Sequence, residues 1–233
     1  MSLPQIDQAI YTLTLSDGTK VEYRPYKVKE EKAILIAKET GTSGDMVKTS
    51  KELVKACTFD KVDVDKLTTF DFEKLFLNIR GKSAGETSDL LITCKECGHK
   101  EEVTVNIEDA RLEGDMKSEK ERTIAITDEV GVVMHYPQIG AADNMEEDQS
   151  TESMMRTIIS CINMIYDAQA IYKAEDSSYE ELSDFVDSLS SKQFADMVEV
   201  ISDMPKLVIN DEFNCSKCKE HNEVKLEGIG SFF

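Results

Sequence analysis

Two pairs of cysteines are the residues in this sequence whose types and spacing could do chemistry. Cys94 and Cys97 form one C-x-x-C pair, and Cys215 and Cys218 form a second. Thiolate sulfur is a strong zinc ligand, and four sulfurs from two such pairs complete a closed tetrahedral site. We therefore predict one structural zinc ion bound by these four residues. Four protein ligands leave no open position for the water that a catalytic zinc needs.

Other interpretations of the cysteines stay open from the sequence. The thiols could remain reduced without binding a metal, or one pair could be a redox site. In thioredoxin-like redox sites the C-x-x-C motif lies between a strand and the N-terminus of a helix. Here β-type sequence lies on both sides of each pair, which favours metal binding. His99 and His221 follow their pairs closely, and either could replace a cysteine as ligand. Cys57 and Cys161 fall on apolar helical faces, so we expect them to be core thiols.

Each cysteine pair is expected to lie in the turn of a β-hairpin. Leu90–Ile92 precede the first pair and Val103–Ile107 follow it, while Leu207–Ile209 precede the second pair and Val224–Leu226 follow it. A strand that turns through C-x-x-C into a second strand is a metal knuckle, because the turn points both thiolates at one spot.

The chain before the first knuckle predicts a hairpin and three helices. Alternating apolar residues around a Ser-Asp-Gly-Thr turn predict the hairpin over residues 11–26. Apolar residues at helical spacing predict helices over residues 28–40 and 44–57. A third helix is expected to begin with an N-cap at Thr68 or Thr69 and to end at Gly81.

The same order of patterns restarts after a charged, aperiodic stretch at residues 111–122, which we interpret as a linker. A second hairpin is expected over residues 124–137, followed by an acidic lead-in and one long helix that reaches Tyr166. Capping boxes at Ser178 and Ser190 each begin a further helix before the second knuckle.

The spacing between the halves indicates an internal repeat. Phe72 and Phe194 are 122 residues apart, and the first cysteines of the two pairs are 121 apart. We therefore predict an α+β fold made by tandem duplication of a β-hairpin, helices and C-x-x-C hairpin, whose two knuckles join as one zinc-ribbon-like site of four cysteines. The expected lobes are residues 1–110 and 123–233, held together by the shared metal. The alternative is that the repeated stripe is that of any amphipathic helix.

Composition excludes several classes of function. Residues 1–110 carry 16 basic and 20 acidic side chains, and residues 111–233 carry 11 and 26, within a net charge of −19. Such a chain repels phosphates, so we expect no nucleic-acid partner. No apolar run is long enough for a membrane span, and the start lacks a signal-peptide pattern, so a cytosolic protein is expected. The acidity fits either a solvated surface or a face for a basic partner.

Motifs for catalysis or for small-molecule binding are also missing. The sequence contains no Walker loop, no G-x-G-x-x-G and no H-E-x-x-H, and no serine or cysteine motif that would pair with His135. We therefore expect no enzyme and no small-molecule substrate. The chain ends in Phe232 and Phe233, an apolar end that would either fold back onto the core or contact a partner.

Two motifs in the N-terminal half carry a resemblance to a known family. Residues 22–32 read E-Y-R-P-x-x-V-K-E-E-K, and residues 75–83 read L-F-L-x-I-R-x-K-S, with the first C-x-x-C following. Over about residues 3–110 the chain resembles the T4-type myovirus baseplate hub subunit family.

This resemblance implies a structural or assembly protein of the baseplate hub of a contractile phage tail. It implies contact with other baseplate and hub proteins, assembly in the host bacterial cytoplasm, and a location in the virion tail baseplate. No catalytic residue comes with the family. The resemblance leaves open whether the protein stays in the virion or acts as an assembly chaperone. A thiol redox or metal-dependent enzyme is the alternative from a different class.

Overall fold

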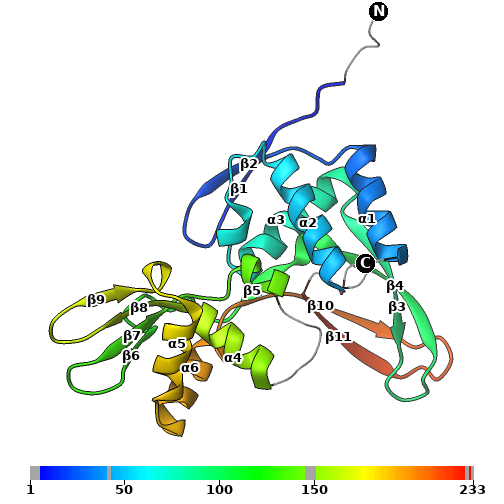
Figure 1. The fold of residues 1–233 in the computed structure, drawn as a ribbon. Coiled ribbons are helices and arrows are strands. Elements are labelled where there is room, and N and C mark those ends of the chain that lie inside the picture. The colour runs from blue at the N-terminus through cyan, green and yellow to red at the C-terminus, as the bar shows by residue number, and fades with distance from the viewer. Residues whose placement is uncertain (1–5, 41–42, 145–150, 229–230, 232–233) are drawn as a thin grey trace, which may run out of the picture. The chain divides into compact units, whose positions relative to one another are not determined.

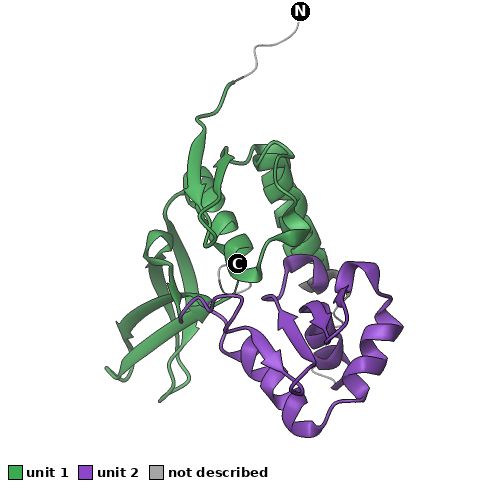
Figure 2. Ribbon diagram, turned by 90° about the vertical axis from the view of Figure 1, so that its left-hand side faces the viewer, with its two compact units in different colours: residues 1–113, 206–233 green, residues 114–205 purple. Residues whose placement is uncertain are grey.

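A computed structural model of the chain describes residues 6–40, 43–144, 151–228 and 231 (Figure 1). The chain divides into two compact units, shown in Figure 2. Unit 1 contains residues 1–113 and 206–233, and unit 2 contains residues 114–205. Helices and strands occur in both units, which confirms the α+β class. The apolar end expected at Phe232 and Phe233 lies outside the described residues.

Unit 1 begins with the expected hairpin, in which β1 (Tyr11–Thr14) pairs antiparallel with β2 (Lys20–Tyr23). In the turn, the Asp17 carboxylate accepts a hydrogen bond from the backbone N–H of Thr19 at 2.8 Å. Gly18 has a φ of +86°, in the left-handed region that favours glycine. The Asp17 hydrogen bond and the positive φ of Gly18 therefore favour the reversal of the chain at this turn.

The helices that follow in unit 1 are α1 (Val28–Thr40), α2 (Ser43–Cys57), the 3-10 turn η1 (Val64–Lys66) and α3 (Thr69–Ala84). Thr68 is the N-cap of α3, and its side chain accepts a hydrogen bond from the Asp71 N–H. The expected end at Gly81 is wrong, because the helix continues to Ala84. Gly85 ends it with a φ of +109°. A positive φ leaves the helical region and is open to glycine, which lacks a Cβ; Gly81 does not have a positive φ.

Helix α3 supplies the centre of unit 1. Its apolar side chains that are no more than 1% exposed are Phe70, Phe72, Leu75, Phe76, Leu77 and Ile79. Asp71 is also buried, and its carboxylate accepts hydrogen bonds from Ser16 N–H at 2.8 Å and Ser16 Oγ at 2.5 Å. A buried carboxylate is costly without such partners, so these bonds hold the β1–β2 hairpin on the first turn of α3.

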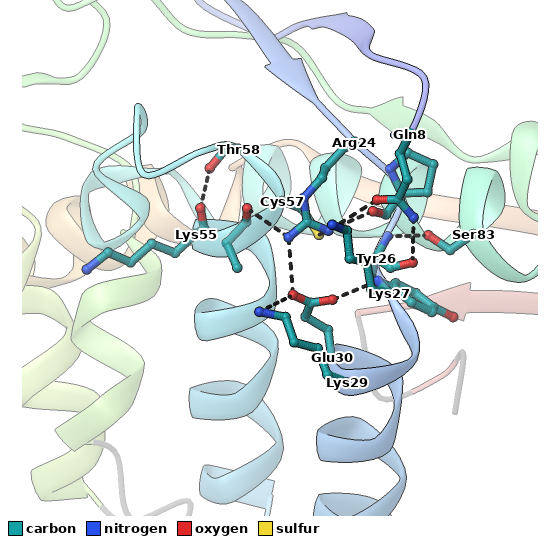
Figure 3. Close-up of polar contacts among 12 residues, drawn as sticks. Gln8, Arg24, Tyr26, Lys27, Lys29, Glu30, Lys55, Cys57, Thr58 and Ser83 are labelled. Atoms are coloured by element: carbon teal, nitrogen blue, oxygen red, sulfur yellow. Dashed lines mark hydrogen bonds and ion pairs between the residues drawn. The ribbon is translucent and has the colours of Figure 1, made fainter. Parts of the chain in front are cut away.

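A buried ion pair joins the end of β2 to the two helices that follow (Figure 3). Arg24 Nη2 lies 3.1 Å from Glu30 Oε1 and donates to the carbonyl of Ala56 at 3.3 Å. Glu30 Oε2 accepts the backbone N–H of Lys27 at 2.7 Å, which closes the first turn of α1. The Arg24 N–H donates to the Cys57 carbonyl at 3.0 Å. One pair of side chains thus connects the hairpin, the start of α1 and the end of α2.

Replacing Glu30 by glutamine is expected to lower the stability of unit 1. It is also expected to make this stability less sensitive to acidification. Burial alone would raise the pKa of Glu30, but hydrogen bonds from the Lys27 backbone and from Arg24 outweigh burial and lower this pKa. A carboxyl with a depressed folded pKa stabilises the fold above its unfolded pKa and loses this contribution as pH falls through the folded pKa. We expect Glu30→Gln to cost about 1–3 kcal/mol at pH 7.

Chemical unfolding curves recorded from pH 7 down to about pH 3 test this expectation, because the difference from wild type must shrink as the carboxyl is protonated. Glu39→Gln is the matched control, since Glu39 lies exposed on the same helix. A Glu30→Gln variant with the wild-type stability and the wild-type pH profile would contradict the assigned role.

The remaining strands of unit 1 are β3 (Thr87–Thr93), β4 (Lys100–Asn106), β5 (Arg111–Glu113), β10 (Lys206–Asn214) and β11 (His221–Glu227), with the 3-10 turn η2 (Ile107–Asp109) before β5. Strands β3 and β4 form one antiparallel hairpin, and β10 and β11 form another. Both knuckle hairpins are therefore confirmed. Strand β5 pairs antiparallel with the other edge of β10, which gives the order β11-β10-β5.

Unit 2 is a four-stranded antiparallel sheet with three α-helices among its described residues. Its strands, in sheet order, are β6 (Thr123–Ala125), β7 (Gly131–Met134), β8 (Ile162–Tyr166) and β9 (Ile171–Lys173). Its α-helices are α4 (Thr151–Ser160), α5 (Tyr179–Asp187) and α6 (Ser191–Ser202), and its 3-10 helices are η3 (Ile139–Asn144) and η4 (Ala174–Asp176). The capping boxes at Ser178 and Ser190 are confirmed, and they fix where α5 and α6 begin. The core of the unit contains Val132, Met134 and Met197.

The expected long helix of unit 2 is wrong in its second half. Helix α4 ends at Ser160, and residues 162–166 form β8, which pairs with β7. The sequence I-N-M-I-Y fits a helical stripe and a strand equally, and β-branched isoleucine favours the strand once a partner is present. Gly131 on β7 lies opposite Tyr166, whose ring occupies the space that a Cβ at Gly131 would need. The tyrosine thus packs over the glycine of its partner strand.

The compact units differ from the expected lobes. Strands β10 and β11, expected within a lobe of residues 123–233, belong to unit 1 because β10 pairs with β5. The first three residues of the stretch interpreted as a linker, 111–122, form β5. The pairing of Leu112 with Leu207 joins residues far apart in the sequence, which no local pattern reveals. The tandem duplication itself stays a prediction.

Candidate metal centre

The two knuckle loops share one pattern of backbone hydrogen bonds. The N–H of the first cysteine, Cys94 or Cys215, donates to the carbonyl five residues later, at 2.8 Å and 2.9 Å respectively. The carbonyl of the same cysteine accepts the N–H four residues later, at 3.0 Å and 2.9 Å. These donors are Gly98, with a φ of +68°, and Lys219, with a φ of +66°. The turn therefore needs a left-handed residue at this position, and the second loop adopts it with lysine.

The loops bring all four predicted ligands together. Cys94 Sγ lies 3.7 Å from Cys218 Sγ, and Cys97 Sγ lies 3.7 Å from Cys215 Sγ, so each contact crosses between the knuckles. All four sulfurs lie within 4.8 Å of one another, and all are free thiols. At a zinc–sulfur distance of about 2.3 Å, a tetrahedral site places its sulfurs about 3.8 Å apart. The donor set therefore fits a metal ion that prefers four thiolates.

The electrostatics of the cluster favour a bound cation. The backbone N–H of Cys97 donates toward Cys94, and with further donors it outweighs burial and lowers the pKa of Cys94 to about 6. At Cys218 a backbone hydrogen bond from Glu220 lowers the pKa, but burial and the three neighbouring thiols outweigh it and raise this pKa to about 12. The Cys94 thiolate thus forms easily. The Cys218 thiolate does not, unless a positive ion offsets the negative charge of the other thiolates.

Residues 8–233 of the chain match the T4 bacteriophage base plate protein family. The chain belongs to this family. The match spans both knuckles, whereas the resemblance recognised from the sequence motifs covers only residues 3–110. No curated protein and no solved structure matches the chain.

Family membership makes the chain a phage baseplate structural protein, located in the tail baseplate and in contact with other phage baseplate proteins. A structural family also favours a role without catalysis. Among the residues that the structure describes, no helix combines the length and the apolar character needed to cross a membrane.

In this baseplate protein, two polar side chains connect the knuckles, and sequence analysis singled out neither. Asn222 is 3% exposed, donates to Cys94 Sγ at 3.5 Å and accepts the Lys95 N–H at 3.0 Å. Glu101 accepts the Ser216 N–H at 2.7 Å. Such partners orient the ligands of a metal site. The available signal for Asn222 was a polar residue at an inward position of an alternating strand.

The histidines and the other cysteines lie apart from this cluster. In the described part of the chain, the group with metal-binding geometry contains the four cysteines and neither His99 nor His221. His221 Nε2 lies 3.6 Å from a carboxylate oxygen of Glu212 instead. Cys57 and Cys161 are fully buried, and burial raises their pKa values to about 11 and about 12. They are confirmed as core thiols.

Excision of unit 2 is expected to leave the thiol cluster able to bind metal. Glu113 and Lys206, where unit 1 is interrupted, are cross-strand partners, so a short Asn-Gly turn can replace residues 114–205. All four cysteines and both connecting side chains lie in unit 1. The shortened chain should therefore bind one equivalent of cobalt(II) in a titration followed by thiolate-to-metal absorption.

The same shortened chain carrying Cys215→Ser is the control and should lose the absorption band. If residues 123–233 form one lobe on which the second knuckle depends, the shortened chain will bind no cobalt, and the assignment of the knuckle to unit 1 fails.

Proposed function

We propose that this baseplate protein is a structural or assembly subunit of the baseplate hub that acts through protein–protein contact and contains one structural zinc ion. Cys94, Cys97, Cys215 and Cys218 would hold the zinc as thiolates. The observation that carries the metal assignment is the convergence of four thiols from two knuckles at tetrahedral spacing. The hub assignment is supported by the motifs at residues 22–32 and 75–83.

The role of the zinc would be to hold two hairpins together rather than to react. Strands β3 and β4 share no ladder with β10 and β11 in the described sheets, so the metal would be a direct link between the two hairpins. Four protein ligands complete the coordination of a structural zinc and leave no site for water or substrate. A rigid pair of hairpins presents a fixed surface to neighbouring proteins, which suits an assembly subunit.

The remaining parts of the proposal concern partners and place of assembly. With a net charge of −19 the chain repels phosphate groups, which supports protein rather than nucleic-acid partners. Assembly in the reducing cytoplasm of the host bacterium would keep the thiols available to zinc. No small-molecule substrate and no membrane partner are part of the proposal. The matching backbone of the two knuckle loops supports their origin by duplication.

Two alternatives make different predictions. An assembly chaperone of the hub would share the contacts and the zinc but leave before the virion is complete. A thiol redox or metal-dependent enzyme would use the low pKa of Cys94 for chemistry rather than for metal binding.

Quantitative mass spectrometry of purified virions and of isolated baseplates tests the location in the hub. Fixed stoichiometry relative to other hub proteins in both preparations supports a resident subunit. Presence in assembly intermediates and absence from virions supports the chaperone.

Metal analysis with thiol titration tests the zinc: one zinc per chain and slowly reacting thiols are expected. A metal-free chain with a reversible disulfide between knuckle cysteines would support the redox alternative and overturn the structural zinc.

A further inference from the structure

The two knuckles contact each other through equivalent positions. The residue seven positions after the first cysteine is Glu101 in the first knuckle and Asn222 in the second. Each of these side chains reaches across to the backbone N–H that directly follows the first cysteine of the opposite knuckle. Glu101 accepts from Ser216 at 2.7 Å, and Asn222 accepts from Lys95 at 3.0 Å. Contacts in which the same positions exchange roles indicate a two-fold relation between the partners.

The sulfur contacts follow the same two-fold relation. In each of them the first cysteine of one knuckle faces the second cysteine of the other, at 3.7 Å between the sulfurs. The N–H groups that Asn222 and Glu101 bind belong to the residues directly after Cys94 and Cys215. A displacement of one knuckle along the other that broke these hydrogen bonds would therefore also separate the sulfurs. The crossed hydrogen bonds and the sulfur contacts specify one and the same register.

The two equivalent positions differ in chemistry. Asn222 is 3% exposed, and its Nδ2 donates to Cys94 Sγ at 3.5 Å and to the Glu220 carbonyl at 3.0 Å, so both ends of the amide have partners. A buried amide that loses its partners is unfavourable, which favours this register over any other. Glu101 is half-buried and has no N–H, so it supplies only the acceptor that the two positions share.

We propose that Glu101 and Asn222 are an equivalent pair of positioning residues that fixes how the knuckles meet and thereby sets the affinity of the thiol cluster for zinc. The affinity part rests on the proposed structural zinc, whereas the crossed hydrogen bonds join protein groups alone. Without one acceptor the four sulfurs would still be present, but binding would have to supply the order that the hydrogen bond now provides. Such partners of metal ligands typically change metal affinity by about 10–100-fold when they are removed.

Amide hydrogen exchange on the full-length chain, resolved residue by residue, tests the pairing directly. Glu101→Ala should speed exchange of the Ser216 amide by at least about tenfold and leave the Lys95 amide slow. Asn222→Leu should speed exchange of the Lys95 amide and leave the Ser216 amide slow. In each case the change appears in the hairpin opposite to the substitution. A general loss of stability would speed both amides together, so the crossed response is specific to the pairing.

Competition with a chromophoric chelator measures the zinc affinity of the same variants. Glu101→Ala and Asn222→Leu should each weaken zinc binding by about 10–100-fold. Glu101→Gln retains a side-chain acceptor and should bind zinc nearly as tightly as the wild type, with a slow Ser216 amide. Glu102→Ala is the matched control, because Glu102 is exposed on the same strand and points to its opposite face. It should change neither the affinity nor the exchange.

The outcomes separate this pairing from the zinc itself. A wild-type chain that binds no zinc overturns the structural zinc, and the exchange experiment still decides the pairing. Fast exchange of the Lys95 and Ser216 amides in the wild type overturns the pairing, whether or not zinc is bound. So does a zinc affinity that neither substitution changes. If Glu101→Ala fails to fold, Glu101→Gln decides, because a loss as large as that of alanine would exclude the acceptor role.

Discussion

Removal of the proposed zinc from this baseplate protein is expected to unfold the knuckle region of unit 1. Structural zinc bound by thiolates contributes about 10–16 kcal/mol to folding, which equals or exceeds the whole net stability of an ordinary domain at about 5–15 kcal/mol. The hairpins β3–β4 and β10–β11 converge at the four thiols, so without the ion they would lose their link. Cys215→Ser should have the same effect, because Cys215 is fully buried in the cluster.

Differential scanning calorimetry with and without a zinc chelator measures this effect, and hydrogen exchange of the β10 and β11 amides locates it. Cys161→Ala is the matched control: it removes a fully buried thiol from unit 2 and should leave the zinc content unchanged. Lowering the pH should release the ion, because protons compete with zinc for the thiolates. A chelated chain that melts like the untreated protein would show that the cluster does not bind a structural metal.

Truncation of Phe72 to alanine is expected to cost unit 1 about 3–5 kcal/mol, close to the limit of what a domain tolerates. Phe72 is fully buried on α3, and its ring stacks on Phe76 with centroids 6.5 Å apart. The loss combines the transfer of the ring to water with the cavity that remains. Because interiors are close-packed, neighbouring residues of α3 can fill only part of that cavity.

Urea unfolding followed by circular dichroism measures the change, and the zinc concentration must be the same for both chains. Phe59→Ala is the matched control, since Phe59 is 38% exposed and its truncation should change stability by less than about 1 kcal/mol. A Phe72→Ala chain within about 1 kcal/mol of wild type would mean that the core of unit 1 is not organised around α3.

Features whose causes are local could be predicted from the sequence. Thr68, Ser178 and Ser190 begin helices because each side chain accepts a backbone N–H within its own first turn. The knuckles could be located because C-x-x-C places two thiols in one turn. Even so, one local prediction failed, because the end of α3 depends on which glycine, Gly81 or Gly85, takes a positive φ.

The meeting of the two cysteine pairs was predicted, but other features that depend on distant partners were not. Residues 162–166 carry an apolar pattern that suits either a helix or a strand, and pairing with β7 decides for the strand. Asn222 and Glu101 gain their roles at the thiol cluster only when the knuckles meet, since their partners Lys95 and Ser216 lie on the opposite knuckle.

The sequence by itself determined the four ligand candidates, most of the helices and hairpins, and the resemblance to a baseplate family, because short-range spacing encodes all of these. The tertiary structure alone decided that β10 joins β5 and that the second knuckle belongs to unit 1. The physical reason is that strand pairing and side-chain burial join residues that lie far apart in the sequence, and the free energy of such contacts leaves no mark on either segment separately.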